Sequence, residues 1–142
     1  MNGVLVDSNV LLDVLTEDPT WFGWSSAQLA RCADSSTLAI NPIIYAEVSV
    51  RFADIAELEE VLPPGVFERL PLPWEAAFLA GKCFLRYRRS KGGGRSPLPD
   101  FYIGAHAAVA GLALLTRDAT RYRTYFPKLQ IIAPEVRQVR HS

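Results

Sequence analysis

Four carboxylates stand where secondary-structure elements are expected to begin or end, on segments that are otherwise mostly apolar. They are Asp7 after the apolar run 4–6, Glu47 within the run 42–48, Asp100 after two prolines, and Asp118 after the run 112–115. A carboxylate on an apolar segment is costly to bury unless it is paired or bound to a cation. If these four side chains converge, their mutual repulsion creates a site for a hard dication such as Mg²⁺ or Mn²⁺.

Each of these acids, taken alone, also has a structural explanation. Asp7 and Asp100 could cap helices, and Asp118 could be a turn residue before Ala119-Thr120. Glu47 is harder to explain in this way, because its helix neighbours are apolar and supply little solvated face. The joint occurrence of the four therefore favours a functional site. Asp13 fits an exposed position on the first helix and is left outside that site.

The elements that would position these acids alternate along the chain. Apolar runs predict strands at residues 3–6, 37–40, 112–115 and 130–132, with a weaker candidate at 67–70. Helical patterns fall at residues 10–15, 20–34, 42–52, 54–62, 73–89 and 100–111, and residues 90–99 predict a loop. In the helix 20–34, the residues expected on a buried face are Trp21, Trp24, Ala27, Leu29 and Ala30. This order predicts an α/β fold with a short parallel sheet in one domain spanning residues 1–142.

A parallel sheet explains how acids so far apart in the chain could meet. In open α/β sheets, sites form beyond the carboxyl ends of the strands. Asp7 and Asp118 each follow a strand, Asp100 opens a helix, and Glu47 lies about one and a half turns into the helix after the second strand. All four are therefore expected at one rim of the sheet. His106, on the same helix as Asp100, lies about 240° around the helix axis from it and should face elsewhere.

The charges are unevenly distributed although the formal net charge is zero. Residues 1–75 hold three Lys/Arg and twelve Asp/Glu, whereas residues 76–142 hold twelve and three, giving −9 and +9. The segment 82–95 holds six Lys/Arg and no acid and could attract phosphate backbones, with Arg88, Arg89, Lys91 and Arg95 as the expected contacts to a nucleic acid. A solvated helix face, or a surface matched to the acidic half of a second subunit, is the alternative.

The composition also limits the class of protein. No apolar run approaches the ~20 residues needed to span a bilayer, and the N-terminus lacks the pattern of a signal peptide. The expected location is therefore the cytoplasm, without membrane association. The two cysteines lack the spacing of a zinc site.

At its acidic segments the sequence resembles the PIN-domain family, specifically the VapC-type toxin ribonucleases. The resemblance lies in Val4-Leu5-Val6-Asp7-Ser8-Asn9-Val10-Leu11-Leu12, Asn41-Pro42-Ile43-Ile44-Tyr45-Ala46-Glu47, Leu98 to Ala107, and Leu114-Leu115-Thr116-Arg117-Asp118 with Tyr122 and Phe126-Pro127. The departures are minor: Ser8 stands where Thr is common, and Gly104 stands where Ala is common.

The resemblance implies an α/β/α sandwich, a homodimer, and a Mg²⁺- or Mn²⁺-dependent endoribonuclease acting as the toxin of a toxin–antitoxin pair. It implies a cognate antitoxin whose tail covers the acidic site. It places the catalytic metal at Asp7, Glu47, Asp100 and Asp118. Among these, Asp7 and Asp100 are expected to bind the metal directly, and Glu47 and Asp118 through water. Asn9 and Thr116 are expected to hold the acids in place by hydrogen bonds.

Three other functions stay open. A phosphatase with Asp7 as an aspartyl nucleophile usually has a second acid two residues on, where this chain has Asn9. A PIN nuclease of RNA maturation would use the same acids as a toxin. A PIN-like module that holds RNA or protein without cutting would not need all four acids intact.

Overall fold

Five short parallel strands form one sheet in a computed structural model that describes residues 3–91 and 97–135. The strand order is β3-β2-β1-β4-β5, and every pairing is parallel. The strands are β1 (Val4–Val6), β2 (Leu38–Ile40), β3 (Phe67–Arg69), β4 (Ala113–Leu115) and β5 (Ile131–Ile132). The α/β class, the parallel sheet and the weak strand candidate at β3 are confirmed.

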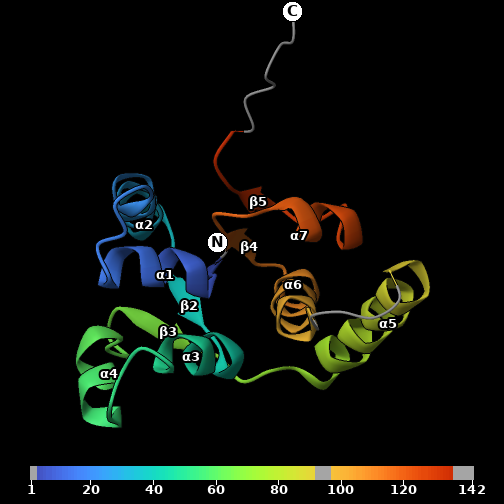
Figure 1. Ribbon diagram of the computed structural model, residues 1–142, viewed down its shortest axis with the longest axis horizontal. Helices are drawn as coiled ribbons and strands as arrows, with labels where there is room; N and C mark the ends of the chain where they lie inside the picture. Colours follow the sequence, from blue (N-terminus) through green and yellow to red (C-terminus); the bar gives the residue numbers. More distant parts are fainter. Residues whose placement is uncertain (1–2, 92–96, 136–142) are drawn as a thin grey trace, which may run out of the picture.

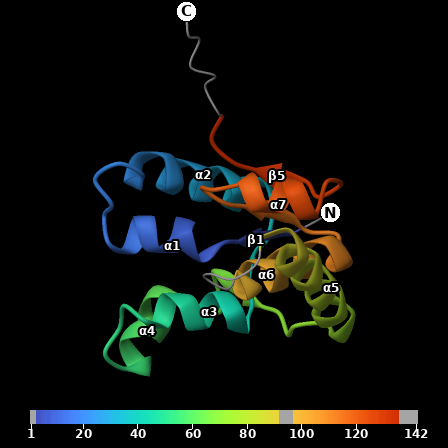
Figure 2. The ribbon, with the colours of Figure 1, turned by 45° about the vertical axis from the view of Figure 1, so that its right-hand side comes forward.

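Helices flank this sheet on both sides (Figure 1). They are α1 (Ser8–Leu15), α2 (Phe22–Ser35), α3 (Pro42–Ser49), α4 (Ile55–Val61), α5 (Trp74–Lys91), α6 (Leu98–Ala110) and α7 (Thr120–Tyr125). Helices α1 and α2 pack against each other, as do α5 and α6, and both pairs lie side by side in Figures 1 and 2. Among the described residues, no helix is long and apolar enough to cross a lipid bilayer.

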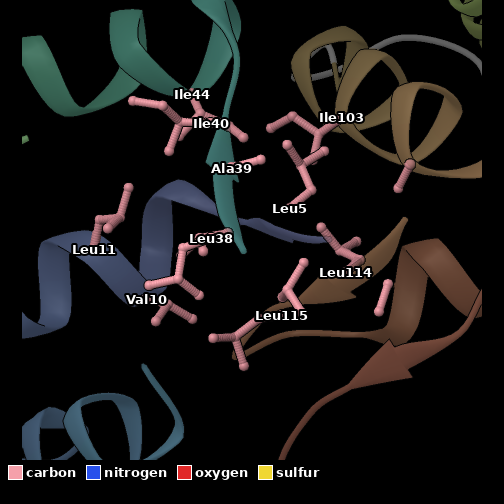
Figure 3. Packing of buried hydrophobic residues seen from close by; sticks show 14 of the residues in the cluster. Leu5, Val10, Leu11, Leu38, Ala39, Ile40, Ile44, Ile103, Leu114 and Leu115 are labelled. Atoms are coloured by element: carbon pink, nitrogen blue, oxygen red, sulfur yellow. The ribbon is translucent and has the colours of Figure 1, made fainter. Parts of the chain in front are cut away.

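The central strands are buried along their whole length. All residues of β1, β2 and β4 are buried, as expected when helices cover both faces of a parallel sheet. Figure 3 shows Ile103 of α6 pointing toward Leu5 of β1, and Ile40 of β2 lying beside Ile44 of α3. This continuous apolar sheet leaves the strand ends as the place where polar side chains can gather.

Asp13 of α1 is a correction to the sequence analysis, because it is buried and only 2% exposed. Its Oδ2 and Oδ1 accept hydrogen bonds from Arg117 Nε at 2.9 Å and Nη2 at 3.0 Å, and Ser25 Oγ donates to Oδ2 at 2.7 Å. The ion pair makes burial of this carboxylate possible. It joins α1, α2 and the segment after β4, and the partner lies 104 positions away in the sequence.

The buried face of α2 was predicted only in part: Trp24 and Leu29 are partly buried and pack against the core, as expected. Ala27 and Ala30 are exposed, while the buried residues of this helix are Ser25 and Cys32. Ser25 faces inward because its hydroxyl binds the buried carboxylate of Asp13. A polar residue therefore takes an interior position that apolar periodicity assigns elsewhere.

Element ends differ from the prediction in the second half of the chain. Helix α5 continues to Lys91 and α6 begins at Leu98, so both helices extend into the segment 90–99 that was predicted as a loop, and residues 92–96 of it lie outside the described part. Asp100 is the third residue of α6 rather than its first. Helix α7 was not predicted. Its residues give no clear apolar stripe, but Tyr122 and the following Phe126 are both buried.

Candidate active site

The four carboxylates singled out in the sequence line a single cavity. Its volume is about 700 Å³. Asp7 follows β1, Glu47 lies on α3, Asp100 on α6, and Asp118 between β4 and α7. The remaining lining residues are Ser8, Asn9, Tyr87, Thr120, Arg121, Tyr122, Thr124 and Tyr125. The chain therefore brings together four acids that it carries on four separate elements.

The strand order explains this meeting point. The chain runs outward from β1 to β2 and β3, then returns to add β4 and β5 on the other side of β1. Such a reversal leaves a crevice at the carboxyl ends of the two neighbouring strands. Val6 pairs with Leu115, and the Asp7 backbone N–H donates to the Leu115 carbonyl oxygen at 2.9 Å. Asp7 and Thr116 therefore leave the sheet next to each other.

Asp7 is buried, at 4% exposure, and its oxygens are held by neutral donors. Oδ1 accepts from the Ser8 backbone N–H at 2.7 Å, and Oδ2 accepts from Thr116 Oγ1 at 2.8 Å and the Tyr122 hydroxyl at 3.0 Å. In the described residues no cationic side chain bonds to it. Burial is the main reason that the pKa of Asp7 is raised to about 6, and the charges of Asp100 and Glu47 raise it further.

Glu47 is held by a neutral donor as well. Helix α3 begins after Asn41, whose Oδ1 accepts from the Ile44 backbone N–H at 2.9 Å. This start places Glu47, half-buried, near α1, where Ser8 Oγ donates to its Oε1 at 2.9 Å. Burial raises the pKa of Glu47, the hydrogen bond from Ser8 opposes this shift, and the charge of Asp100 adds to it.

Asp100 differs from these two because it has a cationic partner. Arg121 Nη1 of α7 donates to Asp100 Oδ2 at 2.6 Å. The two side chains are 39% and 33% exposed. The guanidinium of Arg121 also lies 5.9 Å from the centre of the Tyr87 ring, and both residues line the cavity.

Asp118 is exposed at the rim of the cavity. Its Oδ1 accepts from the Thr120 backbone N–H at 3.3 Å, which is the turn role considered in the sequence analysis. Its own backbone N–H donates to Thr116 Oγ1 at 3.2 Å. The Thr116 hydroxyl, which donates to Asp7, therefore also fixes the backbone that carries Asp118.

Asn9 ties the first acidic segment to the fourth. Its Nδ2 donates to Thr116 Oγ1 at 3.2 Å, and its Oδ1 accepts from the Arg117 backbone N–H at 3.1 Å. Its contact with Asp7 Oδ2 is longer, at 3.5 Å. The geometry thus places Asn9 mainly as a brace between α1 and the segment after β4.

Three of the cavity residues that the sequence analysis gave no role bond to the acids through their side chains: Ser8, Arg121 and Tyr122. Tyr122 is buried, and its hydroxyl reaches Asp7 across 115 positions of sequence. The spacing of a helix beginning at Thr120 would have placed Arg121 and Tyr122 close to Asp118, but the short helix α7 was itself not predicted.

The donor set of the cavity fits a hard divalent cation. Its acidic side chains offer only oxygen. Besides burial, the charges of Asp100 and Glu47 raise the pKa of Asp7, and the charge of Asp100 raises the pKa of Glu47, and a cation would relieve this repulsion. As the side chains stand, no three carboxyl, imidazole or thiol groups in residues 3–91 and 97–135 are close enough to hold one ion. Asp100 is bound to Arg121 in this arrangement.

Two of the basic residues expected to contact RNA, Arg88 and Arg89, lie outside the cavity lining. Arg88 and Arg89 are exposed on α5, next to Tyr87, which does line it. Arg95 and the side chain of Lys91 lie outside the described part of the chain. His106 is buried away from the cavity, with its Nδ1 2.9 Å from Asn41 Nδ2, and burial lowers its pKa.

Solved structures with the same fold have low sequence identity to this chain. VapBC2 from Rickettsia felis bound to a promoter DNA fragment is 18% identical, with a TM-score of 0.67 over 92% of this chain and 97% of that one. A toxin–antitoxin complex from Klebsiella pneumoniae is 19% identical, with a TM-score of 0.64 over 92% and 96%. FitAcB from Neisseria gonorrhoeae is 21% identical, with a TM-score of 0.63 over 90% and 95%.

At these identities the structural likeness establishes the fold alone. A comparison with curated protein sequences gave no match. The family model of the PIN domain matches residues 4–127, a span that contains all four acids and the strand ends that carry them. On this match, together with the parallel sheet of the structure, the chain belongs to the PIN domain family.

Proposed function

We propose that this protein is a Mg²⁺- or Mn²⁺-dependent endoribonuclease that acts as the toxin of a toxin–antitoxin pair. The observation that carries the proposal is the buried carboxylate of Asp7, whose bonds come from neutral donors in a cavity lined by three further acids. Uncompensated carboxylates of this kind are expensive to maintain unless a cation binds them. Phosphodiester hydrolysis is a reaction for which such a cation is useful.

When bound, the metal ion would lower the pKa of a water molecule and offset charge on the phosphoryl oxygens. Asp7 and Asp100 are the residues proposed to bind it directly, and Glu47 and Asp118 to act through water. The neutral donors keep these acids oriented: Thr116 and Tyr122 hold Asp7, and Ser8 holds Glu47. Positioning of this kind commonly affects metal affinity or activity strongly.

The toxin role and the antitoxin partner are supported by likeness to other proteins. One structural neighbour is described as a toxin–antitoxin complex, and two others are VapBC2 and FitAcB. We propose by analogy that this chain binds an antitoxin whose tail covers the acidic cavity. A homodimer and a cytoplasmic location belong to the same proposal.

Cleavage of a fluorescently labelled RNA by the purified protein tests the enzymatic part. We expect cleavage with Mg²⁺ or Mn²⁺, loss of cleavage in EDTA, and loss in the variants Asp7→Asn and Asp100→Asn. Asp34→Asn is the matched control, because Asp34 is exposed on α2 and makes no hydrogen bond or ion pair among the described residues. Variants that lack Asp7 and still cut at the wild-type rate would contradict the assignment.

Two further arms separate the alternatives. RNA binding without cleavage in any metal would favour a non-cleaving module. Hydrolysis of a small phosphomonoester would favour a phosphatase, although the Asn9 side chain is engaged by Thr116 and Arg117 and supplies no second acid.

A further inference from the structure

Among the described residues that line the acidic cavity, one side chain is cationic, and it bonds to a proposed metal ligand. Arg121 lines the cavity and donates from Nη1 to Oδ2 of Asp100 at 2.6 Å. We propose that Arg121 is an exchangeable counter-ion. Its guanidinium binds Asp100 when no divalent cation is present. When a cation binds, the guanidinium releases Asp100 and becomes free to bind a phosphate of the RNA. This inference rests on the proposed function.

The contact has the features of an exchangeable pair. It joins one guanidinium nitrogen to one carboxylate oxygen, and both side chains are more than 30% exposed, at 39% and 33%. Half-exposed ion pairs of this type contribute little stability, because water solvates both partners when they separate. Arg121 can therefore leave Asp100 without leaving a buried charge behind.

Arg117 in the same segment provides the contrast. Two of its nitrogens bind both oxygens of Asp13, which is only 2% exposed, and its guanidinium lies 5.5 Å from the centre of the Trp21 ring. Breaking that pair would leave a buried carboxylate with Ser25 as its remaining partner. The pair of Arg117 with Asp13 is therefore a fixed structural ion pair, whereas Arg121 is free to leave Asp100.

Competition follows from the shared acceptor. The Asp100 carboxylate would be needed both by a divalent cation and by the guanidinium of Arg121. The two positive charges would also repel each other when both lie next to this carboxylate. By linkage, an ion pair that must break before the metal binds lowers the metal affinity by the factor by which the paired state is favoured over the open one. Removing the arginine should therefore strengthen metal binding, the reverse of what is expected for a residue that only supports the fold.

Once released, the guanidinium has a second use at the same place. It lies over Tyr87 on the cavity wall. A guanidinium can bind a phosphate through two parallel hydrogen bonds. The exchange would thus make the cavity ready for an RNA backbone only when the metal is present.

The test measures Mn²⁺ affinity by isothermal titration calorimetry and by the electron paramagnetic resonance signal of free Mn²⁺, without RNA. We expect Arg121→Gln to bind Mn²⁺ about two- to fivefold more tightly than wild type, the size expected for loss of a half-exposed ion pair. Arg123→Gln is the matched control, because Arg123 is exposed on the same helix and has no carboxylate contact among the described residues. Its affinity should equal that of wild type.

Unchanged or weaker Mn²⁺ binding in Arg121→Gln, with normal binding by wild type, would overturn the exchange and leave the proposed function standing. Absence of Mn²⁺ binding in wild type and variant alike would overturn both. Should the variant fail to fold, NMR of the Arg121 guanidinium in the wild-type protein during a Mg²⁺ titration decides the question. We expect its side-chain N–H resonances to shift and lose protection from exchange; resonances that do not change while Mg²⁺ binds would refute the proposal.

Discussion

Asp7 combines three conditions: it is buried, its donors are neutral, and its raised pKa of about 6 lies close to physiological pH. It also caps helix α1. The capping role considered from the sequence is therefore correct, and it does not exclude a role at the cavity. The capping oxygen is Oδ1, which accepts from the Ser8 backbone N–H at 2.7 Å.

The pKa of Asp7 predicts how stability changes with pH in the metal-free protein. The pKa is about 3.9 in the unfolded chain and about 6 in the folded protein. A raised folded-state pKa means that stability is greatest below pH ~4 and falls as pH rises through about 6, by on the order of 3 kcal/mol. We expect Asp7→Asn to remove this fall. Melting temperatures in EDTA from pH 4 to pH 8, compared between wild type and variant, measure it.

A constant difference between the two melting curves across this pH range would show that Asp7 does not titrate as the geometry implies. The comparison with the variant is necessary because other carboxylates of the protein also titrate in this range. Glu47, whose pKa is also raised by burial, should leave a smaller fall of the same sign in both proteins.

Tyr122 is the residue-scale feature that depends most on the tertiary structure. Its hydroxyl donates to Asp7 Oδ2 at 3.0 Å from a side chain that is 2% exposed. We expect Tyr122→Phe to lower the free energy of unfolding at pH 8 by about 1–2 kcal/mol, because the buried carboxylate loses a donor. We also expect Mn²⁺ affinity or cleavage rate to fall about tenfold or more.

Urea unfolding and calorimetry with Mn²⁺ measure these two effects. Tyr102→Phe is the matched control, since Tyr102 is a half-buried residue whose hydroxyl makes no hydrogen bond within the described residues. A Tyr122→Phe protein with normal stability and normal metal binding would mean that this hydroxyl does not support Asp7.

At the scale of elements, α6 and α7 must lie close together to bring Asp100 and Arg121 into contact. The approach depends on Gly104 of α6, where a Cβ atom would lie 2.7 Å from Cδ2 of the Phe126 ring. Phe126 follows α7 and is 5% exposed, so the ring has little room to move. The glycine at this position, noted from the sequence as a departure from the family pattern, therefore has a packing reason.

We expect Gly104→Ala to destabilise the protein by about 1–3 kcal/mol through overpacking. Gly81→Ala is the matched control, because a Cβ there meets nothing within 4 Å, and alanine in a helix interior should stabilise by about 0.5–1 kcal/mol. Chemical denaturation of both variants provides the measurement. If both substitutions change the free energy of unfolding in the same direction, the close contact of Gly104 with Phe126 does not limit the packing of α6 and α7.

At the scale of the whole molecule, the excess charge of the first 75 residues is opposite to that of the rest, −9 against +9. Two of the four cavity acids bond to side chains of the basic half: Asp7 to Thr116 and Tyr122, and Asp100 to Arg121. This juxtaposition suits a polyanion that must approach a negatively charged cavity, because exposed cations nearby offset the repulsion.

We therefore expect RNA affinity to depend on the exposed basic residues of this half. Replacing Arg88, Arg89, Lys91 and Arg95 by glutamine should weaken binding of a single-stranded RNA and reduce the slope of log affinity against log salt by up to about 0.7 per lost phosphate contact. Fluorescence anisotropy with EDTA present separates binding from cleavage. The same slope before and after the substitutions would exclude these residues as backbone contacts.

The sequence by itself determined the class of the fold and the identity of the four acids. Short apolar runs alternating with helical patterns are local features, so β1, β2, β4 and β5 could be placed from residue types alone. The acids stood out because Asp7, Glu47, Asp100 and Asp118 interrupt or end such runs, and parallel strands then imply one rim.

Only the tertiary structure decided which partners these groups have. Asp13 was expected to be exposed, but it is buried and bonded to Arg117 and Ser25. Tyr122 bonds to Asp7, and Arg121 bonds to Asp100, from a helix that the local pattern does not reveal. The physical reason is that the cost of burying a charge depends on donors and counter-ions brought near by folding. These lie up to 115 positions away along the chain, beyond the reach of any periodicity within a single element.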